Sequence, residues 1–176
     1  MVSMLDCICR VPSFLNNIIQ NCGETFEQLF EVYGGKINEI DEIIFIGSGT
    51  SNTSSITACY FAEKASGIRV TAVPPSEFLY SRTVRNKNAL HIFISQTGNS
   101  ILTCEALDYI KSNGFMNAVV SESATTKAAQ KADVFINMNC GKEEYPMRTI
   151  GYSATVLTLM LLGVEVGLKR GHIRIR

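Results

Sequence analysis

The chain has 176 residues, with 16 lysines and arginines balancing 16 aspartates and glutamates. Zero net charge argues against nucleic-acid binding, which usually needs a basic excess. The length suits one ordinary domain, which buries roughly 70% of its unfolded surface without disulfides. The six cysteines complete no zinc-ligand set, and the first residues lack a signal peptide's basic and apolar regions. We therefore expect a cytoplasmic protein with reduced thiols, no metal and no cofactor.

Residues 1–41 are predicted to be a helical segment. Pro12 suits the first turn of a helix, and Gly34 with Gly35 suits its end. Between them, apolar residues recur at steps of three and four, which is typical of an amphipathic helix with one buried stripe. These residues are Leu15, Ile18, Ile19, Cys22, Phe26, Leu29, Phe30 and Tyr33.

Residues 42–168 show a different pattern, in which short apolar runs alternate with longer helix-like segments. Runs without polar alternation are typical of strands buried on both faces. The predicted strands are Ile43–Ile46, Arg69–Val73, Ala89–Ile94, Met116–Val120 and Val134–Met138. Helices are expected near Asn52–Ser66, Ser100–Asn113 and Thr125–Lys131. This alternation predicts an α/β fold with three layers, built on a five-stranded, parallel, doubly wound sheet.

The last long segment, Ile150–Leu168, is apolar on nearly all sides. Such a helix needs cover on more than one face, so we expect a homodimer or pairing with a second domain. Its most apolar part, Ala154–Val164, is too short to span a bilayer, and we expect no membrane association. Residues 169–176 are expected to be a solvated basic tail or a truncation point.

Two loops carry most of the functional information. Residues 47–51 (Gly-Ser-Gly-Thr-Ser) follow the first predicted strand, and residues 95–100 (Ser-Gln-Thr-Gly-Asn-Ser) follow the third. Each loop leads into a helix N-terminus, where unpaired amide groups and the helix dipole favour an anion. In doubly wound sheets, ligands bind beyond the carboxyl ends of the strands. We therefore expect the two loops to share one anion-binding pocket.

The nucleotide-binding alternatives fit these loops poorly. The dinucleotide fingerprint needs a glycine where Asn52 stands and an acidic residue where Pro74 and Pro75 follow the second strand. Neither loop continues into the G-K-[ST] of a P-loop, and the chain has no G-x-S-x-G motif. A phosphate monoester fits better, with backbone amides and hydroxyls as its donors. An ordinary serine-rich helix cap is the remaining alternative.

Three motifs together resemble the sugar isomerase (SIS) domain family. They are Gly49-Thr50-Ser51, Ser76-Glu77-Phe78 and Ser95-Gln96-Thr97-Gly98-x-Ser100, and the resemblance extends over about Ile43 to Gly167. The family includes the isomerase half of glucosamine-6-phosphate synthase and the fructosamine-6-phosphate deglycases. The run from Tyr145 to Thr155 is most similar to the deglycase branch.

The resemblance implies a flavodoxin-like SIS domain that binds a sugar 6-phosphate. Four residues match the positions that grip the phosphate: Ser95, Gln96, Thr97 and Ser100. Thr50 and Ser51 match the loop that faces the sugar, and Glu77 matches a mainly architectural glutamate. Asn99 stands where the synthases have an acidic residue, but the hydroxyl at Ser100 is kept.

The catalytic residues stay unknown. Enzymes that this chain resembles carry two such domains, and their catalytic glutamate and histidine come from the second. His91 is expected in a strand and His172 in the tail, while Glu143 and Glu144 are expected in a solvated loop. Whether Arg148 reaches the ligand or pairs with one of these glutamates stays open.

These observations favour a phosphosugar-binding domain of an isomerase or deglycase that turns over little substrate alone. One alternative is a regulatory module that senses a sugar phosphate without catalysis. Another is a single-domain enzyme whose active site is built across two subunits.

Overall fold

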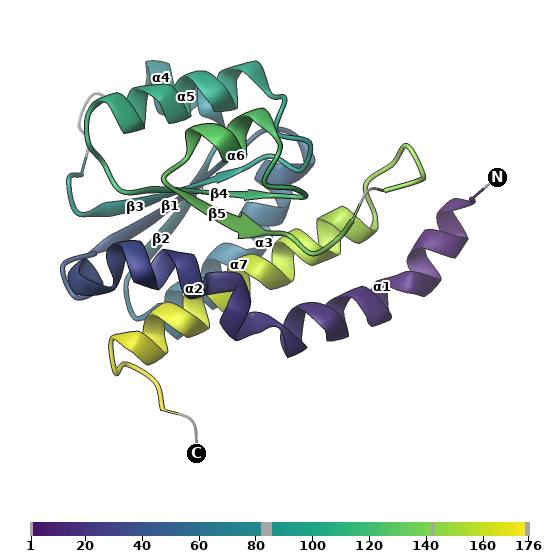
Figure 1. Cartoon of the computed structure of the whole chain (residues 1–176), viewed down its shortest axis with the longest axis horizontal. Helices are drawn as coiled ribbons and strands as arrows, with labels where there is room; N and C mark the ends of the chain where they lie inside the picture. The colour runs from purple at the N-terminus through teal and green to yellow at the C-terminus, as the bar shows by residue number, and fades with distance from the viewer. Residues whose placement is uncertain (1, 82–85, 142, 175–176) are drawn as a thin grey trace.

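The computed structural model describes residues 2–81, 86–141 and 143–174. Its centre is a five-stranded parallel sheet in the order β2-β1-β3-β4-β5, with helices on both faces (Figure 1). The predicted doubly wound α/β fold is confirmed. The strands are β1 (Glu42–Gly47), β2 (Arg69–Val73), β3 (Ala89–Ile94), β4 (Asn117–Ser121) and β5 (Val134–Asn137).

Each face of the sheet has its own hydrophobic core, because successive strand residues point to opposite faces. In β1, Ile43 and Phe45 belong to one core, while Ile44 and Ile46 belong to the other. This double burial is why the predicted strands read as continuous apolar runs. The helices that follow β1 are α3 (Thr50–Ser66), α4 (Pro75–Tyr80), α5 (Ile101–Ser112), α6 (Lys127–Lys131) and α7 (Ile150–Lys169).

The N-terminal segment forms two helices, α1 (Met4–Gln20) and α2 (Cys22–Tyr33), which meet at Asn21. The prediction of a single helix starting near Pro12 was wrong. Ser3 and Asp6 form a reciprocal capping box that starts α1 earlier, and the exposed Pro12 lies inside the helix. A short 3₁₀ turn, Gly34–Lys36, follows α2 where the paired glycines predict an end. The start of α1 projects from the body of the molecule (Figure 1).

Helix α7 is covered largely by this chain's own helices. A Cβ on Gly163 would lie 2.6 Å from the Ala62 Cα, and one on Gly167 would lie 2.1 Å from the Ala65 carbonyl oxygen. Helix α3 therefore packs directly on α7, and α1 and α2 add further cover. By length and apolar composition α7 could cross a membrane, but buried core helices pass the same test, and 56% of its apolar window is buried.

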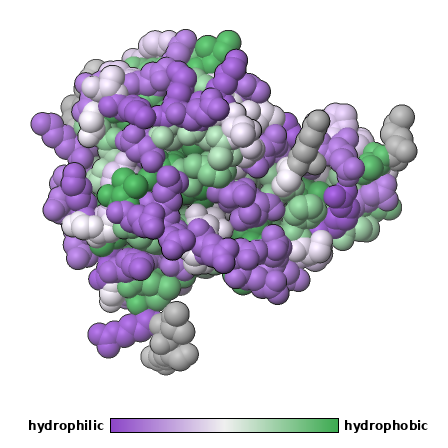
Figure 2. Space-filling model, in the orientation of Figure 1, coloured by the Kyte–Doolittle hydropathy of each residue, from purple (hydrophilic) through white to green (hydrophobic). Residues whose placement is uncertain are grey.

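The described part of the predicted basic tail is mostly exposed, but Arg170 anchors its start. Arg170 is half-buried, and its Nη1 donates to the carbonyl oxygens of Ile37 at 2.6 Å and Ile40 at 2.9 Å. Lys169 lies 5.1 Å from the ring centroid of Phe30, a cation–π contact. Residues 175–176 of the predicted tail lie outside the described residues. The face of the molecule shown in Figure 2 is mostly hydrophilic, with hydrophobic residues between the polar ones.

Candidate functional site

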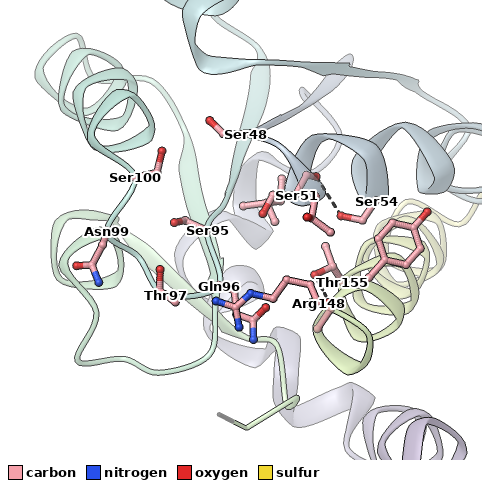
Figure 3. A pocket seen from close by; sticks show the side chains of 14 residues that line it. Ser48, Ser51, Ser54, Ser95, Gln96, Thr97, Asn99, Ser100, Arg148 and Thr155 are labelled. Carbon is pink, nitrogen blue, oxygen red and sulfur yellow. Dashed lines mark hydrogen bonds between the residues drawn. The ribbon is translucent and has the colours of Figure 1, made fainter. Parts of the chain in front are cut away.

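The two predicted loops meet at the carboxyl edge of the sheet. Strands β1 and β3 are neighbours, and Gly47 pairs with Ile94 at their carboxyl ends. A pocket of about 390 Å³ lies beyond this edge (Figure 3). All six candidate residues line it: Thr50, Ser51, Ser95, Gln96, Thr97 and Ser100. The pocket lining also includes residues that were not predicted as site residues: Ser48, Ser54, Ile94, Asn99, Arg148, Gly151, Tyr152 and Thr155.

The first loop turns sharply because two of its residues are glycines. Gly49 has φ +56°, a conformation that favours glycine over residues with a Cβ. A Cβ on Gly47 would lie 2.9 Å from the Ser51 Cβ, so the chain could not turn as tightly with a larger residue. Helix α3 starts at once, and no side chain caps its N-terminus. The turn therefore places Thr50 and Ser51 on the pocket wall.

The second loop is held by β4 and α6. The Gln96 carbonyl oxygen accepts from the Ser121 hydroxyl at 2.9 Å and from the Glu122 N–H at 3.0 Å. Gly98 has φ +65°, and a Cβ there would lie 2.3 Å from the Thr126 Cβ. The loop leads into α5, whose N-cap Ser100 makes no side-chain cap hydrogen bond. The first amide groups of α5 are therefore available to a ligand at this end of the pocket.

Several pocket hydroxyls have no protein partner within the described residues. They belong to Ser48, Thr50, Ser51, Ser95 and Thr97. The Ser100 hydroxyl accepts from Thr103 Oγ1 at 2.9 Å and keeps its own proton to donate. In contrast, Ser54 and Ser55 donate back to the Ser51 carbonyl oxygen at 3.0 and 2.7 Å. These unpartnered hydroxyls line the pocket and are available to a polar ligand.

Helix α7 supplies the opposite wall. Gly151, in its first turn, leaves room for the Gln96 carboxamide, because a Cβ there would lie 2.2 Å from Gln96 Oε1. The buried Gln96 Nε2 has no hydrogen-bond partner among the described residues. The Tyr152 hydroxyl lies 2.9 Å from Thr57 Oγ1, which ties α7 to α3 beside the pocket. Gln96 therefore depends on a tertiary contact that the loop sequence alone does not reveal.

Neither glutamate of the preceding loop lines the pocket. Glu143 Oε1 accepts from the N–H groups of Thr149 at 2.6 Å and Ile150 at 2.8 Å, and Oε2 accepts from Gly151 N–H at 3.2 Å. Burial alone would raise the pKa of Glu143, but these hydrogen bonds outweigh it and hold the pKa below its ordinary value. The expectation that Glu143 is solvated was therefore wrong, because it caps α7.

The question left open for Arg148 is answered by the pairing of its neighbours. Glu144 is exposed as expected and forms an ion pair with Arg10, at 2.5 Å. Arg148 forms no salt bridge within the described part of the chain and lines the pocket instead. Arg148 therefore reaches the pocket and pairs with neither glutamate.

The remaining titratable candidates lie elsewhere. His91 is fully buried in β3, with Nδ1 3.1 Å from the Met116 carbonyl oxygen. His172 packs against Gly67 after the end of α7, and Glu77 is exposed in the first turn of α4. Among the described residues, the pocket lining includes no carboxylate, imidazole or thiol.

A parallel α/β domain with a hydroxyl-lined pocket at two neighbouring strand ends belongs to the class that binds small anionic ligands. The SIS domain family model matches residues 36–165, and the chain belongs to this family. The resemblance of the three sequence motifs to the SIS domain family is therefore confirmed.

A curated relative from Fusobacterium nucleatum is named glutamine–fructose-6-phosphate aminotransferase (isomerizing). It is 32% identical over 143 residues, which are 81% of this chain but 24% of the relative. The chain spans about a quarter of the length of the curated relatives it matches.

Solved structures share the fold. A Clostridium difficile 630 protein assigned as a phosphosugar isomerase superposes with a TM-score of 0.88 at 26% identity, over 99% of this chain and 48% of that one. The sugar isomerase domain of an RpiR transcription factor from Sphaerobacter thermophilus gives a TM-score of 0.67 at 19% identity, over 93% of both chains, which shows the fold alone.

Proposed function

We propose that the pocket binds a sugar 6-phosphate, with the phosphate at the second loop and the sugar facing the first. The observation that carries this proposal is the group of hydroxyls without protein partners beside the uncapped N-terminus of α5. Ser95, Gln96, Thr97 and Ser100 would donate to the phosphate, and Thr50 and Ser51 to the sugar. Family membership supports a sugar phosphate as the ligand class.

We propose further that the chain is part of a cytoplasmic isomerase or fructosamine-6-phosphate deglycase and is catalytically incomplete alone. Proton transfer between sugar carbons needs a base with a pKa near neutrality, and the described pocket lining supplies no carboxylate or imidazole. The Clostridium difficile structure is about twice as long, which is consistent with a second domain that supplies the missing groups.

The association of this chain with a copy or a second SIS domain stays a prediction. Helix α7 gives less support to this association than expected, because its apolar side chains are already buried or half-buried within the chain. Exposed apolar side chains on α1 now support it better, including Leu5 at 67% and Ile19 at 54% exposure. The boundaries after residues 41 and 168 also stay predictions.

Binding is tested by titration calorimetry of the chain with glucitol 6-phosphate and with glucitol. We expect the phosphorylated ligand alone to bind measurably. Removing one hydroxyl that donates to a charged group costs about 1.5–3 kcal/mol, so Ser95→Ala should weaken binding roughly 10- to 100-fold. Ser112→Ala is the matched control, because Ser112 is exposed at the far end of α5. Equal binding of both ligands would refute a phosphate-directed site.

Catalysis is tested separately, by incubating the purified chain with fructose 6-phosphate and with fructosamine 6-phosphate. Substantial turnover by the chain alone would show that the site is complete. The alternative is a sensing module without catalysis, which the fold of the RpiR transcription factor domain makes a specific competitor. Repeating both assays on the longest polypeptide that the gene encodes distinguishes the two roles. Binding without turnover in that polypeptide supports the sensing role.

A further inference from the structure

Arg148 stands out in an otherwise uncharged pocket. Among the described residues that line it, Arg148 alone carries a charge, and the rest offer hydroxyl, amide, phenol or apolar groups. The phosphate loop of residues 95–100 contains no lysine or arginine. A phosphate ester bound there would carry close to two negative charges at pH 7. The donors of the loop are all uncharged, so the loop itself supplies no cation to balance the charge of the phosphate.

The charge of Arg148 is available because the nearby acids have other partners. Glu143 accepts hydrogen bonds from the start of α7, including the Thr149 N–H and hydroxyl at 2.6 Å each. Glu144 pairs with Arg10 on α1. Both glutamates therefore hold the segment that carries Arg148 without neutralising it.

The direction of the side chain indicates which part of a ligand it would meet. Figure 3 shows Arg148 extending from the start of α7 across the pocket toward Gln96, next to the phosphate loop. We propose that Arg148 is the residue that selects a dianionic phosphate over a monoanionic group at this site. This inference rests on the proposed sugar 6-phosphate function and adds to it the charge state that the pocket requires.

The physical reason is a difference between two kinds of donor. Hydroxyls and amides satisfy oxygen lone pairs, which a sulfate and a phosphate both offer. A guanidinium also interacts with the net charge, and this interaction grows with the charge of the ligand. The charge of the ligand therefore sets the discrimination.

The test compares glucitol 6-phosphate with glucitol 6-sulfate, a monoanion of similar shape, by titration calorimetry at pH 7.5. Loss of one charge-assisted contact of about 1.5–3 kcal/mol corresponds to roughly 10- to 100-fold. Arg148→Gln should lose about that much affinity for the phosphate and less for the sulfate, whose charge is half as large, so the ratio of the two affinities should fall. Arg148→Lys should keep part of the ratio, because it keeps the charge.

Arg69→Gln is the control, because Arg69 is exposed at the start of β2, away from the carboxyl edge. It should leave both affinities unchanged. A second readout is pH: the phosphate loses its second charge near pH 6. Phosphate affinity should therefore fall between pH 7.5 and 5 in the unaltered chain, less so in Arg148→Gln, and not for the sulfate.

An unchanged affinity ratio in Arg148→Gln, with the unaltered chain still binding the phosphate, would overturn this role and leave the proposed function intact. An equal loss for both ligands would also overturn it, because a purely structural effect does not distinguish ligand charge. If the unaltered chain binds neither ligand, the proposed function fails and this role fails with it.

Discussion

Removing the charge of Glu143 is predicted to destabilise the start of α7. Its two oxygens accept three backbone N–H groups and the Thr149 hydroxyl, at 2.6 to 3.2 Å. A helix cap contributes about 1 kcal/mol, and an anion at a helix N-terminus adds roughly 0.3–1 kcal/mol. Glu143→Gln keeps part of the hydrogen bonding, so we expect a loss of about 1–2 kcal/mol in the free energy of unfolding.

The assay is urea unfolding followed by circular dichroism at pH 7 and again near pH 4. Glu144→Gln is the matched control, because Glu144 is the adjacent glutamate in an exposed ion pair, which solvent screens strongly. The control should therefore destabilise the protein less than Glu143→Gln. The same comparison by thermal unfolding should show a midpoint about 2–8 °C lower for Glu143→Gln.

The pH dependence provides the stricter test. The native hydrogen bonds hold the pKa of Glu143 below its ordinary value of 4.5, whereas the unfolded chain has the ordinary value. The stabilisation is therefore complete above pH 4.5 and is lost as pH falls through the lower, native pKa. The difference between the unaltered chain and Glu143→Gln should shrink as the medium becomes acidic. A difference that is independent of pH, or equal to that of Glu144→Gln, would refute the capping role.

Two further predictions concern packing and thiol reactivity. Gly163→Ala should destabilise the fold by about 1–3 kcal/mol in urea unfolding, because its Cβ would lie 2.6 Å from the backbone of Ala62; an unchanged midpoint would mean that α3 and α7 can separate freely. Burial raises the pKa of the Cys140 thiol to about 12, so iodoacetamide at pH 8 should modify the exposed Cys9 well before Cys140. Mass spectrometry after brief labelling checks the order, and equal rates would contradict the burial of Cys140.

The strands could be predicted closely because their signal is local and strong. Each predicted strand lies within one residue of the observed one at either end, since side chains buried on both faces leave an uninterrupted apolar run. The parallel direction of the strands also follows from their alternation with helices, whereas the observed strand order was not predicted. The parallel direction is why two loops 48 residues apart could be expected to share one edge, as Gly47 and Ile94 show.

The N-terminal helices show where local reasoning is insufficient. Pro12 suits a first turn, but the Ser3–Asp6 capping box starts the helix two turns earlier, and the proline is tolerated on an exposed face. The apolar periodicity continues across Asn21, so the break between α1 and α2 has no periodic signal. Competing start signals of similar strength cannot be ranked without knowing how the helix packs.

The pocket wall formed by α7 was the least predictable part of the site. Residues 143–149 contain two acids and one arginine, and sequence alone allows several pairings among them. In the structure both acids have other partners. Glu144 pairs with Arg10 on α1, and Glu143 accepts hydrogen bonds from the start of α7. Because both acids are engaged elsewhere, Arg148 pairs with neither of them and lines the pocket.

This arrangement couples the stability of α7 to ligand binding. The capped first turn carries Gly151 and lies next to Arg148, and Gly151 leaves the space that the Gln96 side chain occupies. A ligand that contacts Gln96 and Arg148 would therefore order the same turn that Glu143 caps. Because binding to the native state stabilises it by mass action, a saturating ligand should raise the free energy of unfolding of both the unaltered chain and Glu143→Gln. The rise should be smaller for Glu143→Gln, because a less ordered turn weakens the affinity of that variant and the linkage between binding and stability is reciprocal.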